Sequence, residues 1–91
     1  MTNRLKDLNE ILDALKQGIA QLETARQEIN AEEKRVRQYI PSHGTEIILT
    51  RLKHIQKENA YLRAEIEKRI DATNNLIAVE EILRKYGATS D

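Results

Sequence analysis

The sequence lacks several residue types on which other classes of protein depend. Its 91 residues include no cysteine, no phenylalanine and no tryptophan, with one proline and three glycines. The absence of cysteine excludes disulfides, thiol chemistry and thiolate zinc sites, and it fits a reducing compartment. Aromatic side chains are scarce, and they are only Tyr39, Tyr61 and Tyr86. This scarcity disfavours a sheet or a ligand cavity and favours slender helix-on-helix packing.

Long apolar runs and an excess of one charge are also missing. No apolar run approaches the roughly 20 residues that a membrane-spanning helix needs, and no basic start with an apolar stretch marks a secretory signal. We therefore expect an intracellular protein, cytoplasmic or nuclear, without a membrane span. Lys and Arg together number 15, as do Asp and Glu. Because nucleic-acid binders usually carry a basic excess, nucleic acid is not the expected partner.

The feature that is present is a heptad pattern. Apolar residues alternate at three- and four-residue spacing along the first 40 residues, and only Arg26 and Glu33 interrupt them. The members of this stripe are Leu5, Leu8, Leu12, Leu15, Ile19, Leu22, Ile29, Val36 and Ile40. Such spacing places one apolar stripe along a helix, and the stripe requires a partner helix to cover it.

One short cluster of helix-breaking residues divides the chain. Pro41 cannot continue a helix, and it stands with Ser42, His43 and Gly44. The sequence predicts a turn over 41–44, which is short enough to force antiparallel neighbours. We therefore expect one all-α domain, residues 1–91, that forms a long antiparallel helical hairpin of the coiled-coil type.

The expected helices cover about residues 3–40 and 45–86. Thr2 or Asn3 is suited to cap the first helix, and Thr45 is suited to cap the second. Gly87 is expected to end the second helix, which leaves residues 88–91 as a frayed tail.

The second helix carries two apolar stripes that are out of phase. The first consists of Ile48, Leu52, Ile55, Leu62 and Ile66, with Asn59 between them, and the second of Leu76, Val79, Leu83 and Tyr86. Residues 71–75, which favour caps, separate the stripes and allow a kink or a break into three helices. We prefer one continuous helix, because the two arms match in length and a fold-back would leave Leu5–Leu15 uncovered.

The hairpin predicts a register in which the numbers of facing residues add to about 85. Arg26 then lies opposite Asn59, so the two polar residues of the stripes share one layer. A polar layer in a coiled coil lowers stability and fixes alignment. In the alternative interpretation, Arg26 extends into solvent and the coincidence has no structural meaning.

Two helices do not account for all the apolar side chains. The residues that lie beside the predicted stripes, and that we expect to bind a partner, are Ile11, Ile47, Leu49, Ile70, Ile77 and Ile82. A two-stranded pair covers a narrow stripe, whereas a helix in a bundle shows a wider one. We therefore expect further helices, supplied by self-association into a helical bundle or by a different helical subunit.

No set of residues indicates catalysis or ligand binding. The two histidines, His43 and His54, have no partners at metal-ligand spacing. The adjacent carboxylates of Glu32–Glu33 and Glu80–Glu81 point in different directions on a helix and cannot act as an acid–base pair. We predict no catalytic residue, no cofactor site and no metal site, and therefore a protein that is not an enzyme.

The sequence favours a coiled-coil structural or assembly subunit, a scaffold-like component that binds other helices in a homo- or hetero-oligomeric complex. Its residues match no family motif. One alternative is a dimeric helical-hairpin regulator that binds nucleic acid through basic residues, which are Lys34, Arg35, Arg37, Arg51, Lys53 and Lys57. Another is a small helical chaperone or adaptor that holds a client against the isoleucine-rich face.

Overall fold

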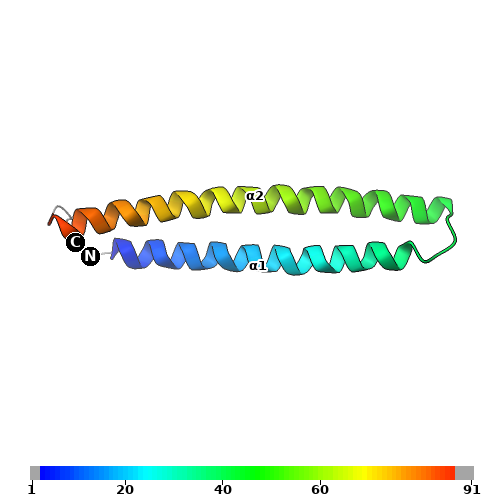
Figure 1. Ribbon diagram of the computed structural model, residues 1–91, viewed down its shortest axis with the longest axis horizontal. Coiled ribbons are helices and arrows are strands. Elements are labelled where there is room, and N and C mark those ends of the chain that lie inside the picture. Colours follow the sequence, from blue (N-terminus) through cyan, green and yellow to red (C-terminus); the bar gives the residue numbers. More distant parts are fainter. Residues whose placement is uncertain (1–2, 88–91) are drawn as a thin grey trace. The chain divides into compact units, whose positions relative to one another are not determined.

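The computed structural model describes residues 3–87 and contains two α-helices, α1 (Arg4–Val36) and α2 (His43–Lys85), joined by residues 37–42 (Figure 1). The helices run antiparallel and no strand occurs in this range, so the predicted all-α helical hairpin is confirmed. α2 is continuous through residues 71–75, and the alternative of a break there is wrong. The predicted tail at 88–91 and the candidate cap Thr2 lie outside the described residues.

The outer ends of both helices have the caps that the sequence indicates. Asn3 caps α1, since its Oδ1 accepts a hydrogen bond of 3.1 Å from the backbone N–H of Lys6. At the other end, Gly87 adopts a positive φ of 67°, and its N–H donates to the carbonyl of Arg84 at 3.1 Å. A left-handed glycine just past the last turn ends a helix without steric cost.

The connection is longer than predicted. α1 ends at Val36 instead of residue 40, and the turn therefore spans 37–42 instead of 41–44. After Val36 the α-helical hydrogen-bond pattern gives way to a turn, in which the N–H of Tyr39 donates to the carbonyl of Val36, three residues earlier, at 3.1 Å. Pro41 disfavours helical geometry at Ile40, whose side chain is 88% exposed. Val36, which is 3% exposed, is thus the last stripe residue of α1 that is covered.

Ser42, and not Thr45, caps α2. The Ser42 Oγ accepts a hydrogen bond of 3.2 Å from the Thr45 N–H, and the Thr45 Oγ1 accepts one of 2.8 Å from the Ser42 N–H. This reciprocal pair has the geometry of a capping box, with Thr45 at its third position. Sequence reasoning chose the wrong member of the pair because both residue types are good caps.

The cap at Ser42 gives the first stability prediction. Replacing Ser42 by alanine leaves the first N–H groups of α2 without their side-chain acceptor, so the free energy of unfolding should fall by about 1 kcal/mol. Ser42→Asp is the matched control, since aspartate can accept the same hydrogen bond. Urea unfolding followed by circular dichroism measures both variants. Equal losses in the two variants would contradict the assigned cap.

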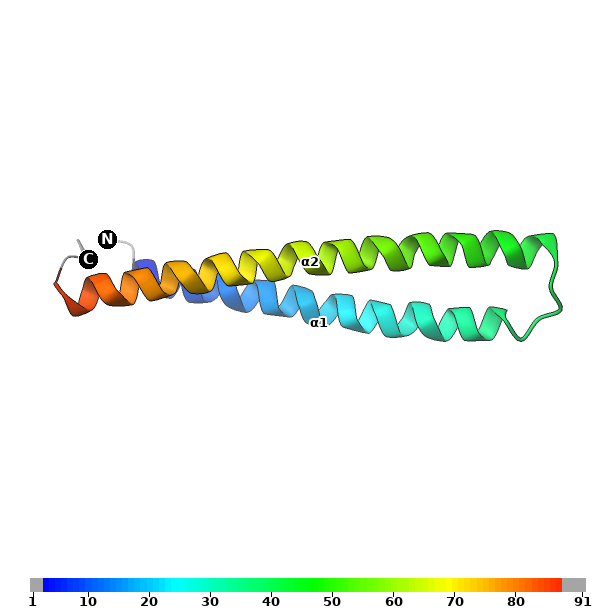
Figure 2. The ribbon, with the colours of Figure 1, turned by 45° about the horizontal axis from the view of Figure 1, so that its top comes forward.

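Contacts within the chain fall into two units. Unit 1 comprises Met1–Ile19 and Glu65–Asp91, and unit 2 comprises Ala20–Ala64. In each unit a segment of α1 lies antiparallel beside a segment of α2 (Figure 1; Figure 2). The buried apolar side chains are Leu8 and Leu12 in unit 1 and Val36 in unit 2. All three belong to the predicted stripe of α1, so that stripe is the one that α2 covers.

The face that α2 turns toward α1 agrees with the predicted one in part. Leu52, Asn59 and Ile66 of the predicted stripe are covered, whereas Ile48, Ile55 and Leu62 are 44%, 44% and 50% exposed. The covered positions form a heptad series in which Leu49, Leu52, Gln56, Asn59 and Arg63 lie in unit 2 and Ile66, Ile70, Thr73, Ile77 and Glu80 lie in unit 1. All ten are buried or half-buried. Where the two series differ in unit 2, the helix turns the more polar residues toward α1.

Candidate functional site

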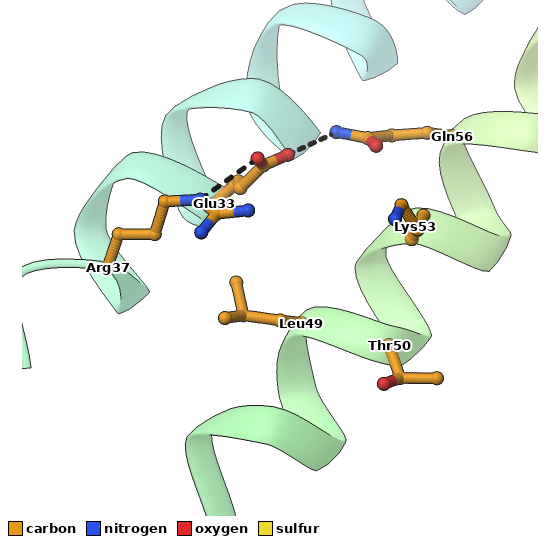
Figure 3. Close-up of a pocket in the computed structure, with 6 residues that line it drawn as sticks. All are labelled: Glu33, Arg37, Leu49, Thr50, Lys53 and Gln56. Carbon is orange, nitrogen blue, oxygen red and sulfur yellow. Dashed lines mark hydrogen bonds and ion pairs between the residues drawn. The ribbon is translucent and has the colours of Figure 1, made fainter. Parts of the chain in front are cut away.

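A network of hydrogen bonds explains why α2 turns polar side chains toward α1 in unit 2. Gln56 donates from Nε2 to Asn30 Oδ1 at 3.2 Å and to Glu33 Oε2 at 2.6 Å. Figure 3 shows Gln56 and Arg37 reaching the Glu33 carboxylate from two sides, and the Arg37 Nε lies 3.2 Å from Glu33 Oε1. The hydrogen bond from Gln56, followed by that from Arg37, lowers the pKa of Glu33. The polar side chains of α2 are thus tolerated because α1 supplies their partners.

A second carboxylate of unit 2 joins the two helices. Glu23 Oε2 lies 2.9 Å from the Nε of Arg26 on the same helix and 2.8 Å from the Nη1 of Arg63 on α2. The hydrogen bond from Arg26 is the largest cause that lowers the pKa of Glu23 to about 2, and Arg63 adds to it. Glu23 therefore stays ionised and links α1 to α2 over the whole physiological pH range.

Glu23 gives a prediction for acid unfolding. The pKa of Glu23 is about 2 in the folded chain, whereas an unperturbed glutamate, as in the unfolded chain, has a pKa of 4.5. Its contribution to stability is therefore present above pH 4.5. That contribution should be lost as the pH falls from 4.5 toward 2. Glu23→Gln should flatten the pH dependence of the urea midpoint in this window, whereas Glu28→Gln, at an exposed position of the same helix, should not. An unchanged profile in Glu23→Gln would contradict the assignment.

The predicted register agrees with the contacts, while the two residues of the predicted layer lie differently. Arg63 pairs with Glu23, so their residue numbers add to 86, close to the predicted 85. Asn59 is buried at 8% exposure and donates from Nδ2 to the Leu22 carbonyl at 3.1 Å. The Arg26 side chain is 50% exposed and bonds Glu23, although it lines the same cavity of about 220 Å³ as Asn59. Asn59 therefore occupies the layer between the helices, and Arg26 lies at its edge.

Two of the six basic residues that could form a nucleic-acid site are paired with carboxylates. Arg35 forms an ion pair with Glu32, and Arg37 forms one with Glu33. This pairing reduces the positive charge that the cluster could offer to a phosphate backbone. It gives no support to the alternative of a nucleic-acid regulator.

In the described range, the titratable residues form no cluster suited to a metal ion. His54 Nε2 lies 3.0 Å from Glu58 Oε1 on the same exposed helix face. Within residues 3–87, no group of three or more His, Cys, Asp or Glu side chains could hold a metal ion. Neither helix, as far as the chain is described, has a stretch long and apolar enough to cross a membrane.

The residues predicted to bind a partner divide into two groups. Leu49, Ile70 and Ile77 are half-buried and belong to the series that faces α1. The other three are exposed, with Ile11 at 50%, Ile47 at 45% and Ile82 at 55%.

Three exposed residues of α2 were not among the residues predicted to bind a partner. Leu76, Val79 and Leu83, which the sequence assigned to the stripe inside the hairpin, are 46%, 52% and 38% exposed. Their heptad phase could have identified them, because Leu76 comes one residue before Ile77 and therefore lies outside the series that faces α1.

These exposed residues gather on one side of unit 1. Leu76 comes one residue before Ile77 of the series that faces α1, and Ile11 comes one residue before the buried Leu12. Leu83 follows Leu76 by seven residues and therefore has the same heptad phase. In an antiparallel heptad pair, such positions of both helices lie on the same side. Val79 lies beside them on α2, at three- and four-residue spacing from Leu76 and Leu83. We name Ile11, Leu76, Val79 and Leu83 the unit 1 apolar face.

The opposite side of unit 1 is polar. Positions one residue after the facing series are all exposed, and all but Ala78 are polar; they are Lys6, Asn9, Asp13, Lys16, Glu67, Asp71, Asn74, Ala78 and Glu81. One side of unit 1 therefore bears the unit 1 apolar face, flanked by the charged residues Arg4, Asp7, Glu65 and Arg69, and the other side is hydrated. No protein-family model, curated protein or solved structure matches the chain.

Proposed function

We propose that this chain is a non-enzymatic coiled-coil assembly subunit that binds other helices through the unit 1 apolar face. The observation that supports the proposal is the balance of buried and exposed apolar side chains. Among the described residues, the buried apolar side chains are Leu8, Leu12 and Val36, whereas thirteen large apolar side chains are exposed. Four of these exposed side chains lie together in the unit 1 apolar face, and clustered apolar surface commonly marks a protein–protein interface.

The energies involved are large for so small a fold. Full burial of one aliphatic side chain contributes about 1.5–3 kcal/mol. The four residues of the unit 1 apolar face are about half exposed, so covering them would contribute roughly 3–6 kcal/mol. A small domain has a total stability of only about 5–15 kcal/mol. Covering this face would therefore add substantially to the stability of the folded state.

The chain buries little of its surface by itself. It exposes 7145 Å², whereas a typical folded monomer of its mass exposes about 5400 Å². This difference agrees with the small number of buried apolar side chains.

The spacing of the face favours a helix as the binding partner. Leu76, Val79 and Leu83 repeat at three and four residues, as does the stripe of α1 that α2 covers. Ridges at this spacing pack into the grooves of another helix. A small helical chaperone would use the same face, but it would bind its client as a stable monomer.

The proposal is tested by photo-crosslinking in the cells that produce the protein. Val79 is replaced by benzoylphenylalanine, and the control carries the same group at Asn74 on the hydrated side of the same helix. We expect Val79 to crosslink to a helical segment, of this chain or of another, in marked excess over Asn74. Equal yields at the two positions, or none at Val79, would contradict the proposal.

A further inference from the structure

The segment of α2 in unit 1 bears a surface heptad series with an uneven distribution of charge. Its members are Glu65, Arg69, Ala72, Leu76, Val79, Leu83 and Tyr86. Glu65 is half-buried and the other six are exposed. The series begins with two charged residues and ends with a leucine and a tyrosine, and its apolar centre belongs to the unit 1 apolar face.

This distribution discriminates between the two directions in which a second copy could bind. A parallel copy would place Arg69 against Arg69, and like charges in register repel. The charge of Glu65 is already paired with Lys68 on the same helix at 3.4 Å. An antiparallel copy reverses the order, so that each Arg69 meets the uncharged end of the other series. The arrangement of charge therefore disfavours the parallel pair and is compatible with the antiparallel one.

An antiparallel pair centred between Leu76 and Val79 also matches side chains by size and chemistry. Leu76 then faces Val79 of the second copy, and Ala72 faces Leu83, which alternates small and large groups as well-packed layers do. Arg69 faces Tyr86, whose ring can accept the guanidinium in a cation–π contact. Tyr86 is 76% exposed in the single chain, so it is accessible for such a contact.

The charge of the whole chain permits self-association. Fifteen basic residues balance fifteen acidic ones, so two copies do not repel each other through net charge.

We infer that the unit 1 apolar face is covered by the same face of a second copy of this chain, with the two α2 segments antiparallel and centred between Leu76 and Val79. This inference rests on the proposed function, because it names the helix that the assembly subunit binds. The hydrated side of unit 1 stays exposed in this dimer.

The mass of the purified chain in solution is the first test. Sedimentation equilibrium should give about twice the chain mass of 10.5 kDa. Leu76→Glu should halve that mass, whereas Asn74→Glu on the hydrated side should not change it. The double variant Leu76→Glu with Val79→Lys should restore the dimer, because the antiparallel pairing places the new carboxylate opposite the new ammonium group.

Disulfide exchange between single-cysteine variants tests the direction. The chain has no native cysteine, so Ala72→Cys and Leu83→Cys each introduce the only thiol. When the two variants are mixed in a glutathione buffer, an antiparallel pair should give the mixed 72–83 disulfide in excess over both homodisulfides. Glu10→Cys, at an exposed position of α1 outside the face, should stay reduced and serves as the control.

The possible outcomes separate the inference from the proposed function. An excess of homodisulfides would overturn the antiparallel arrangement, and a monomeric wild-type chain would overturn self-association. If the chain is monomeric while Val79 crosslinks to a helix of a different protein in cells, the second-copy inference fails and the proposed function stands. Should Leu76→Glu lose its helical circular dichroism signal, the mass of the wild-type chain and the cysteine exchange decide the question.

Discussion

Replacing Leu12 by alanine is expected to lower the free energy of unfolding by about 2–4 kcal/mol. Leu12 is 9% exposed and is one of the three buried apolar side chains in the described part of the chain. Its truncation removes buried apolar area and leaves a cavity that two straight helices cannot readily close. Because the total stability of a domain of this size is small, the variant should be close to unfolding at 37 °C.

The matched control for Leu12→Ala is Ile40→Ala. Ile40 loses a comparable amount of side chain, but it is 88% exposed in the connection, so the expected change is below about 0.5 kcal/mol. Both variants are compared by urea unfolding at one fixed chain concentration, since association would otherwise shift the midpoints. Similar changes in the two variants would show that Leu12 does not lie in a packed core.

Two substitutions at Asn59 are expected to change stability in opposite directions. Asn59 is buried between the helices of unit 2, where it donates a hydrogen bond to the Leu22 carbonyl. Asn59→Leu replaces a buried amide by an apolar group, so the free energy of unfolding should rise by about 1–2 kcal/mol. Asn59→Ala removes the hydrogen bond and leaves a void, and should lower it by about 1–2 kcal/mol.

The signs of these two changes are the critical observation. Buried polar residues in coiled coils lower stability and fix alignment, and Asn59→Leu isolates the first of these effects. Thermal and urea unfolding at equal concentration give both values. If Asn59→Leu destabilises the chain as much as Asn59→Ala does, the amide contributes net stability and the polar-layer interpretation is wrong.

Those features of the fold that depend on local sequence could be predicted. The stripe of α1 required only a three- and four-residue repeat. Asn3 caps α1 with its side-chain oxygen, and Gly87 ends α2 because glycine adopts a positive φ without steric cost. The hairpin followed from one cluster of breakers between two helical arms. The turn was placed too late, because Pro41 marks where a helix cannot continue and gives no information on how far upstream α1 ends.

The face of α2 could not be chosen from apolar residues alone. Ile48, Ile55 and Leu62 form the more apolar series, but the structure turns Gln56 and Arg63 toward α1. The partners of these polar residues lie on the other helix, more than twenty residues away in sequence. Their favourable pairing therefore becomes visible only when the two helices are placed side by side.

The unit 1 apolar face was missed for the same reason, because the sequence did not show which face of α2 contacts α1. Once α2 turns its more polar series inward in unit 2 and Ile70 and Ile77 inward in unit 1, the stripe of Leu76, Val79 and Leu83 is left outside. The sequence had indicated a surplus of apolar side chains and had assigned part of it to the wrong residues. Leu76 and Ile77 are adjacent in sequence, and only their heptad phase decides that Ile77 faces α1 while Leu76 is exposed.

The central claim is that apolar side chains which the hairpin leaves exposed are covered by another helix. It is tested most directly by measuring the mass of the purified chain by light scattering together with its thermal unfolding over a range of concentrations. We expect an oligomer whose melting temperature rises with concentration, or a chain that unfolds without cooperativity when it is alone. A monomer that melts cooperatively at a temperature independent of concentration, and whose Val79 position gives no crosslink to another helix in cells, would contradict the claim.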